Sequence, residues 1–176
     1  MTDNTEFTAL DLIAAYADTW RLLLEYDEDR LEMPDRAKPA TGALDLEHAV
    51  GAIDALRQDL AAKGEASTLF GSPRGDALAA ILGNIDQTMF GEPLYRSREE
   101  KAAHLLYFVV KDHPFTDGNK RIGALLLLLY LAREGMAQSL DSRALTALTL
   151  LIAESAPARK DLMIRLIVNL LAESSD

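Results

Sequence analysis

The segment Asp112-His-Pro-Phe-Thr-Asp-Gly-Asn-Lys-Arg-Ile122 (DHPFTDGNKRI, residues 112–122) lies between two strongly hydrophobic stretches of a 176-residue chain. Pro114 predicts the end of a helix here, because proline has no amide hydrogen and disfavours α geometry at the residue before it. Gly118 allows backbone conformations that a side chain would block. The segment therefore predicts a polar turn between two buried helices.

Outward from this turn, apolar residues recur at spacings of three and four along most of the chain, which is typical of amphipathic helices. The expected helices are Thr8–Leu31, Leu46–Lys63, Asp76–Asp86, Ser97–Lys111, Asn119–Glu134, Ser142–Glu154 and Pro157–Glu173. Trp20 and Tyr107 stand at helical spacing and are expected in the core. The pattern predicts an all-α fold, a single compact helical bundle over residues 1–176.

The stretch Gln87–Tyr95 (QTMFGEPLY) interrupts the helical pattern. Its β-branched and aromatic residues flank a Gly-Glu-Pro turn, which indicates a short hairpin or an extended flap. It has too few strand residues to build a sheet. We therefore expect the helical bundle to carry one short β-hairpin flap.

Composition excludes several classes of function. The chain has no cysteine, so disulfides, thiol nucleophiles and thiolate metal sites are ruled out. Its formal net charge of −10 repels phosphodiester backbones and argues against nucleic acid as a partner. The longest apolar run, Ile122–Ala132, is shorter than the roughly 20 residues that cross a bilayer, and no secretory signal is visible. We expect no membrane partner and a cytoplasmic location, in the producing cell or in one that receives the protein.

The turn is also predicted to bind an anion. Amides at the start of a helix have no acceptor within it, and the helix dipole makes this end positive. The amides concerned belong to Gly118, Asn119, Lys120 and Arg121. Phosphate groups of a nucleotide are the natural occupants, and Asp117 is placed to hold Mg²⁺ against them. Phe115, the one apolar residue among these polar ones, is expected to anchor the loop in the core.

Structural interpretations of the same residues stay open at this point. A histidine beside a helix end often caps the last carbonyls, and Asp117 can serve as an N-cap for the next helix. Lys120 and Arg121 can be solvated charges, although cations at a helix N-terminus oppose the dipole. The gathering of histidine, acid, glycine, asparagine and two cations within nine residues favours a functional interpretation.

The stretch His113–Arg121 resembles the signature of the Fic/Doc family, written H-P-F-x-[DE]-G-N-G-R-x-x-R in most Fic enzymes. Eight positions match when Lys120 is counted as the Doc-like variant. The resemblance covers roughly Ile81 to Leu131. It implies the Fic/Doc fold and a transferase that modifies a Ser, Thr or Tyr hydroxyl of a target protein, with ATP or another nucleoside triphosphate as co-substrate.

The resemblance also implies roles for individual residues. His113 would be the general base, since imidazole exchanges protons near neutral pH, and Asp117 would coordinate Mg²⁺ on the phosphates. Arg121 would stabilise the charge that develops during transfer. The anion cradle would be Gly118, Asn119, Lys120 and Arg121. The flap residues that hold the target chain beside the histidine would be Gln87, Thr88, Met89 and Phe90.

Two departures from the Fic pattern affect the expected reaction. Lys120 stands where most Fic enzymes have glycine, and Ala124 stands where they have a second arginine that orients the outer phosphates. The N-K-R form resembles the Doc branch, whose members transfer the terminal phosphate. Phosphate transfer is therefore favoured over AMP transfer (AMPylation), and a non-catalytic nucleotide- or peptide-binding module is the third alternative.

Many Fic proteins restrain themselves with a helix that bears [ST]-x-x-x-E-[GN]. Thr2 and Glu6 have this spacing, but Phe7 follows them instead of Gly or Asn. The arginine that such a glutamate would block is also replaced, by Ala124. The resemblance therefore favours a separate antitoxin-like inhibitor protein as a partner.

Overall fold

The computed structural model describes residues 8–173. The chain divides into two units, Met1–Glu32 and Met33–Asp176, and each is described by itself. Thr2, Glu6 and Phe7 lie outside the described residues. The single domain expected over residues 1–176 stays a prediction.

The first unit contains two short helices, α1 (Ala9–Ala15) and α2 (Ala17–Asp27), where the sequence predicts one. The interruption falls at Tyr16, whose φ of −108° and ψ of 26° leave the α region. Trp20 is 50% exposed, so the prediction that it belongs to the core is wrong. Two short consecutive helices offer no second layer within this unit on which an indole could be buried.

The second unit is the expected helical bundle with its small hairpin. Its elements are α3 (Leu46–Ala62), α4 (Ala77–Ile85), β1 (Thr88–Met89), β2 (Glu92–Pro93), α5 (Arg98–Asp112), α6 (Asn119–Arg133), α7 (Ser142–Glu154), a 3₁₀ turn (Pro157–Arg159) and α8 (Lys160–Glu173). The all-α prediction is confirmed. Within residues 8–173, no helix combines the length and the apolar character needed to cross a membrane.

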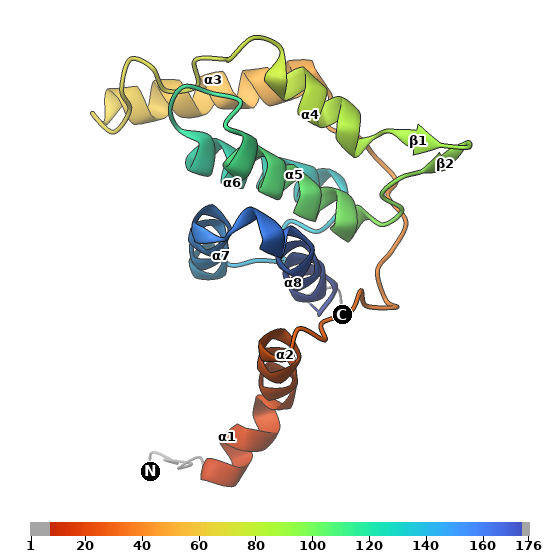
Figure 1. Cartoon of the computed structure of the whole chain (residues 1–176). Coiled ribbons are helices and arrows are strands. Elements are labelled where there is room, and N and C mark those ends of the chain that lie inside the picture. Colours follow the sequence, from red (N-terminus) through yellow and green to blue (C-terminus); the bar gives the residue numbers. More distant parts are fainter. Residues whose placement is uncertain (1–7, 174–176) are drawn as a thin grey trace. The chain divides into compact units, whose positions relative to one another are not determined.

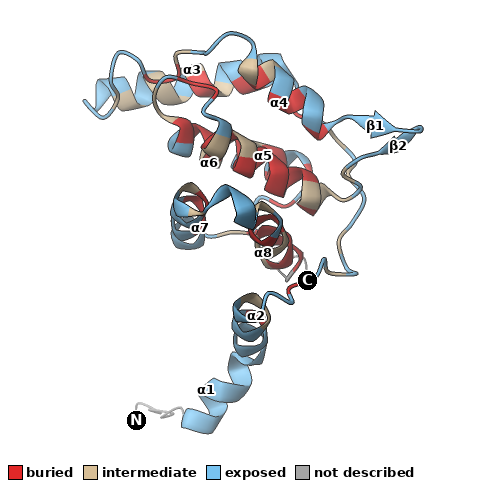
Figure 2. Cartoon of the chain, viewed as in Figure 1, coloured by how far each residue is buried: buried red, intermediate tan, exposed pale blue. Residues whose placement is uncertain are grey.

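Helix α5 lies at the centre of the second unit and contacts α4, α6, α7 and α8. In Figure 1, α5 and α6 run between a layer of α3 and α4 and a layer of α7 and α8. Figure 2 shows the buried residues gathered on the faces that these layers turn toward one another. A Cβ added to Gly123 of α6 would meet Val110 Cγ2 of α5 at 3.1 Å, so this glycine lets the two helices pack closely.

Side-chain caps mark the starts of α5 and α7, as the sequence predicts. Asp141 accepts a hydrogen bond from the Ala144 amide at 2.8 Å and caps α7, and Ser97 accepts one from the Glu100 amide at 3.0 Å and caps α5. Such caps satisfy amides that have no acceptor within the helix. These two caps therefore account for where α5 and α7 begin.

The hairpin is antiparallel, with Met89 opposite Glu92, which confirms the predicted flap as an element. Phe90 at its tip is 99% exposed and has a positive φ of 53°. The hairpin precedes α5, whereas His113 follows it, and a helix of 15 residues is about 22 Å long. Figure 1 shows the hairpin at the end of α5 away from the loop that leads into α6.

His104 of α5 packs against the segment that follows strand β2. Its ring stacks on Tyr95 with centroids 3.8 Å apart, and its Nδ1 lies 2.8 Å from the Glu100 carbonyl oxygen. Burial lowers the pKa of His104 to about 4. The folded chain therefore favours the neutral imidazole at every pH above that value.

The free energy of unfolding should fall as the pH drops from 6.5 to 4. In the unfolded chain His104 binds its proton near pH 6.5, and in the folded chain only near pH 4, so the unfolded state binds more protons in this window. The loss should reach at most roughly 3 kcal/mol. His104→Phe, which keeps an aromatic ring on Tyr95, should flatten the dependence. Urea unfolding from pH 7.5 to 4 measures both curves, and parallel curves would contradict the assignment.

Candidate active site

The loop between α5 and α6 is held by a distant segment, residues 65–74, which we call the pairing segment. Phe70 forms a bridge with Asp117, and Pro73 forms one with Phe115. Three backbone hydrogen bonds connect the two: Gly71 N to Asp117 O at 3.0 Å, Thr116 N to Ser72 O at 2.9 Å and Arg74 N to Pro114 O at 2.9 Å. The loop is thus fixed by main-chain pairing as well as by its two helices.

His113 ends α5 in the left-handed conformation, with φ of 51° and ψ of 62°. The following proline disfavours α geometry at this residue, as the sequence predicts. The side chain is exposed and lines the cavity described below. Its Nδ1 lies 3.4 Å from Asn119 Nδ2, so the ring and the amide are neighbours in the loop.

Asn119 is buried at the start of α6, and its side chain binds the loop. Its Oδ1 accepts from the Phe115 amide at 3.0 Å, and its Nδ2 donates to the Phe115 carbonyl at 2.9 Å. Both ends of the amide are therefore engaged within the protein. This side chain therefore shapes the turn, and the part of Asn119 that the sequence predicts for the anion cradle is its backbone amide. Phe115 itself is buried, as expected of a core anchor.

Gly118 cannot be replaced without disturbance. Its φ is +87°, and a Cβ at this position would lie 2.4 Å from Cε2 of Phe70. The Phe70 ring is fully buried and lies directly against the Gly118 backbone. Glycine is therefore required here by both conformation and space, which agrees with the expectation from the sequence.

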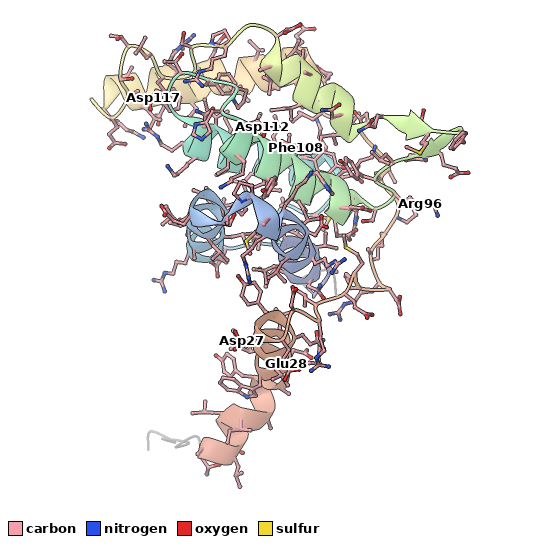
Figure 3. All side chains as sticks on the ribbon, viewed as in Figure 1. Asp27, Glu28, Arg96, Phe108, Asp112 and Asp117 are labelled. Atoms are coloured by element: carbon pink, nitrogen blue, oxygen red, sulfur yellow. The ribbon has the colours of Figure 1, made fainter. Side chains whose placement is uncertain are left out.

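Asp117 lies on this loop, where Figure 3 labels it. Its Oδ2 accepts from Ser67 Oγ at 2.7 Å, and its Oδ1 accepts from the Gly118 amide at 2.8 Å. The hydrogen bond from Ser67, with that from Gly118, holds the pKa of Asp117 below its usual value. The carboxylate is thus ionised at neutral pH and suited to a cation. The Gly118 amide is occupied by this bond, so the free amides of the predicted cradle begin at Asn119.

Lys120 and Arg121 are exposed on the first turn of α6. Arg121 Nη1 donates to the Glu65 carbonyl at 2.7 Å, and its guanidinium lies 4.6 Å from the centroid of the Phe70 ring. The pairing segment therefore sets the direction of Arg121. The Gly118 N-cap supplies no side-chain acceptor to the first amides of α6.

These residues enclose one cavity of about 420 Å³. It is lined by His113, Thr116, Asp117, Gly118, Asn119, Lys120 and Arg121. The imidazole, the carboxylate, both cations and the N-terminus of α6 thus share a single space. That combination can bind an anion, hold a divalent cation beside it and accept a proton.

The structure does not bring the predicted flap to this cavity. Gln87, Thr88, Met89 and Phe90 lie at the far end of α5. The pairing segment occupies the place beside the loop instead, and its Ser67, Phe70 and Glu65 were not among the residues singled out from the sequence. Phe70 offers a signal of this packing in the sequence, because a phenylalanine in a polar segment is often buried.

Residues 43–131, half of the chain, match the model of the Fic/DOC family. The chain belongs to this family. Members of the Fic/DOC family are generally transferases, and the matched range contains the pairing segment, the loop and most of α6. No curated protein sequence and no solved structure matches the chain.

A second cavity of about 290 Å³ adjoins the Fic/DOC loop. It shares Lys120 and Arg121 with the first cavity. Its other lining residues are Ala124, Leu145, Thr146, Thr149 and Leu150. The position where most Fic enzymes carry a second arginine therefore opens onto a largely apolar pocket in this chain.

Gly118→Ala should destabilise the protein by roughly 2–4 kcal/mol, because the new methyl group combines left-handed strain with a collision against Phe70. It should also change the cavity beside Gly118, since the loop must move to relieve the collision. Gly51→Ala is the matched control. Gly51 lies in α3 with no atom within 4 Å of an added Cβ, so this variant should be slightly more stable. Equal unfolding free energies for the two variants in urea would contradict the packing argument.

Proposed function

We propose that this Fic/DOC protein transfers a phosphate from a nucleoside triphosphate to a Ser, Thr or Tyr hydroxyl of a target protein. One observation carries the proposal: His113, Asp117 and the N-terminus of α6 line the same cavity. A structural role alone would not require an exposed base, an ionised acid and two cations around one opening.

His113 is the base in the proposed reaction. Its side chain is exposed, so a hydroxyl of another protein can reach it without passing through the core. The imidazole accepts the hydroxyl proton as the oxygen attacks phosphorus, and the nucleoside diphosphate leaves. Asn119, which is held by Phe115, lies beside the ring with its Nδ2 3.4 Å from His113 Nδ1.

Asp117 is the residue that would hold Mg²⁺. Within the described part of the chain, no three His, Cys, Asp or Glu side chains form a metal-binding group. Magnesium in nucleotide sites is commonly held by one or two carboxylates together with substrate phosphates, which fits a single aspartate beside an anion site. When bound, the ion would neutralise charge on the phosphate oxygens. The donor set therefore fits the cofactor.

The first amides of α6, Lys120 and Arg121 hold the transferred group. As phosphorus is attacked, negative charge spreads over its oxygens, and donors fixed in advance stabilise that charge. Arg121 is fixed in this way by Glu65 and Phe70. Glu65 binds it only through a carbonyl oxygen, so the guanidinium retains its other donors for a ligand.

Transfer of the terminal phosphate is favoured over transfer of AMP by the cavity beside Ala124. Ala124 stands there in place of the second arginine with which most Fic enzymes orient the outer phosphates, and the lining beyond Lys120 and Arg121 consists of alanine, leucine and threonine. A separate inhibitor protein is the proposed partner besides the target.

His113→Ala should abolish transfer to protein, because the attacking hydroxyl then has no base. Incubating the purified chain and a cell lysate with γ-labelled ATP should label a lysate protein with wild type, and the variant should reduce the label at least 100-fold. A parallel reaction with α-labelled ATP should stay unlabelled.

Other labelling results would point to a different reaction or to no reaction. Label from α-labelled ATP would show AMP transfer instead of phosphate transfer. Equal labelling by wild type and His113→Ala would exclude His113 as the base. Binding of ATP without labelling of any protein would support a non-catalytic module.

A further inference from the structure

The carboxylate of Asp117 is positioned by a residue 50 positions away in the sequence. Ser67 donates to its Oδ2 at 2.7 Å, while the Gly118 amide donates to its Oδ1 at 2.8 Å. Two donors on different oxygens fix the plane of the carboxylate as well as its place. Each oxygen retains a second lone pair, so the group can still bind a cation.

The direction of the Ser67 hydroxyl is itself determined. Its Oγ accepts from the Leu69 amide at 3.2 Å within a turn of the pairing segment. A carboxylate can only accept, so the serine proton must point at Asp117. The Gly71 amide also donates to the Asp117 carbonyl at 3.0 Å. The pairing segment therefore holds Asp117 by both its main chain and its side chain.

We propose that Ser67 is a positioning residue of the transfer site, which orients Asp117 for a divalent cation bound with a nucleotide. The proposal rests on the proposed function. Magnesium requires near-ideal octahedral geometry, so the angle at which a single protein ligand meets it matters. Ligating carboxylates are in turn held by hydrogen bonds, and loss of such a partner typically weakens metal binding 10- to 100-fold.

Ser67 is exposed, so its replacement should leave the fold intact. Ser67→Ala removes the donor to Asp117, and Ser67→Thr keeps it. Thr68→Ala is the matched control. Thr68 is also an exposed hydroxyl residue of the pairing segment, but the hydrogen bond to Asp117 comes from its neighbour Ser67. All three variants should unfold at the same urea concentration as wild type.

The test measures Mn²⁺ binding in the presence of a non-hydrolysable ATP analogue, by the electron paramagnetic resonance signal of free Mn²⁺. The apparent Kd for Mn²⁺ should rise about tenfold in Ser67→Ala and stay within about twofold of wild type in Ser67→Thr and Thr68→Ala. In transfer assays, Ser67→Ala should raise the KM for Mg²⁺ and recover most of its kcat at saturating Mg²⁺.

A Kd for Mn²⁺ that is the same in Ser67→Ala and wild type would overturn the inference. So would a threonine variant that binds as poorly as the alanine variant, or a loss in Ser67→Ala matched by lower stability. Failure of the proposed function looks different: wild type itself would then show no nucleotide-dependent binding of Mn²⁺.

Discussion

The ring of Phe70 occupies the space that a side chain on Gly118 would need, and the site is arranged around that contact. The glycine takes a left-handed conformation that turns the chain sharply from the loop into α6. The same ring lies beneath the guanidinium of Arg121. One buried aromatic residue thus sets both the turn that exposes the first amides of α6 and the direction of the neighbouring cation.

The cavity beside the loop carries positive charge, although the net charge of the chain is negative. The chain carries a formal charge of −10, yet Lys120, Arg121 and the open end of α6 face one small cavity. An acidic surface repels extended polyanions, whereas a few cations and amides at short range can hold a single phosphate group. Asp117 adds a negative charge beside them, which suits an anion that arrives with a divalent cation. The electrostatics therefore favour a nucleotide over a nucleic acid.

Much of the fold follows from local sequence. Apolar spacing and caps such as Ser97 and Asp141 predict the helices of the second unit, and Pro114 and Gly118 predict the turn that carries His113. The interruption between α1 and α2 at Tyr16 could not be predicted, because no proline or glycine stands there. The exposure of Trp20 escapes prediction because spacing shows that a stripe is apolar but not whether another layer covers it.

The position of the pairing segment beside the loop also cannot be predicted from local sequence, because it depends on contacts between residues far apart in the chain. Ser67 and Asp117 are 50 residues apart in the sequence, and they meet because the pairing segment, which follows α3, pairs with the loop that leads into α6. The hairpin at Thr88–Pro93 has clearer strand signals, so it was the natural candidate for a flap. Chain topology places it at the opposite end of α5, a 15-residue helix about 22 Å long.

In the proposed reaction, the loop after α5 gathers the phosphate oxygens of a nucleotide next to His113. A crystal structure of the chain with Mg²⁺ and a non-hydrolysable ATP analogue tests it most directly. We expect phosphate oxygens within hydrogen-bond distance of the first amides of α6, the cation on Asp117 and the His113 ring facing phosphorus. Phosphates bound elsewhere, or a His113 ring turned away from them, would contradict the account.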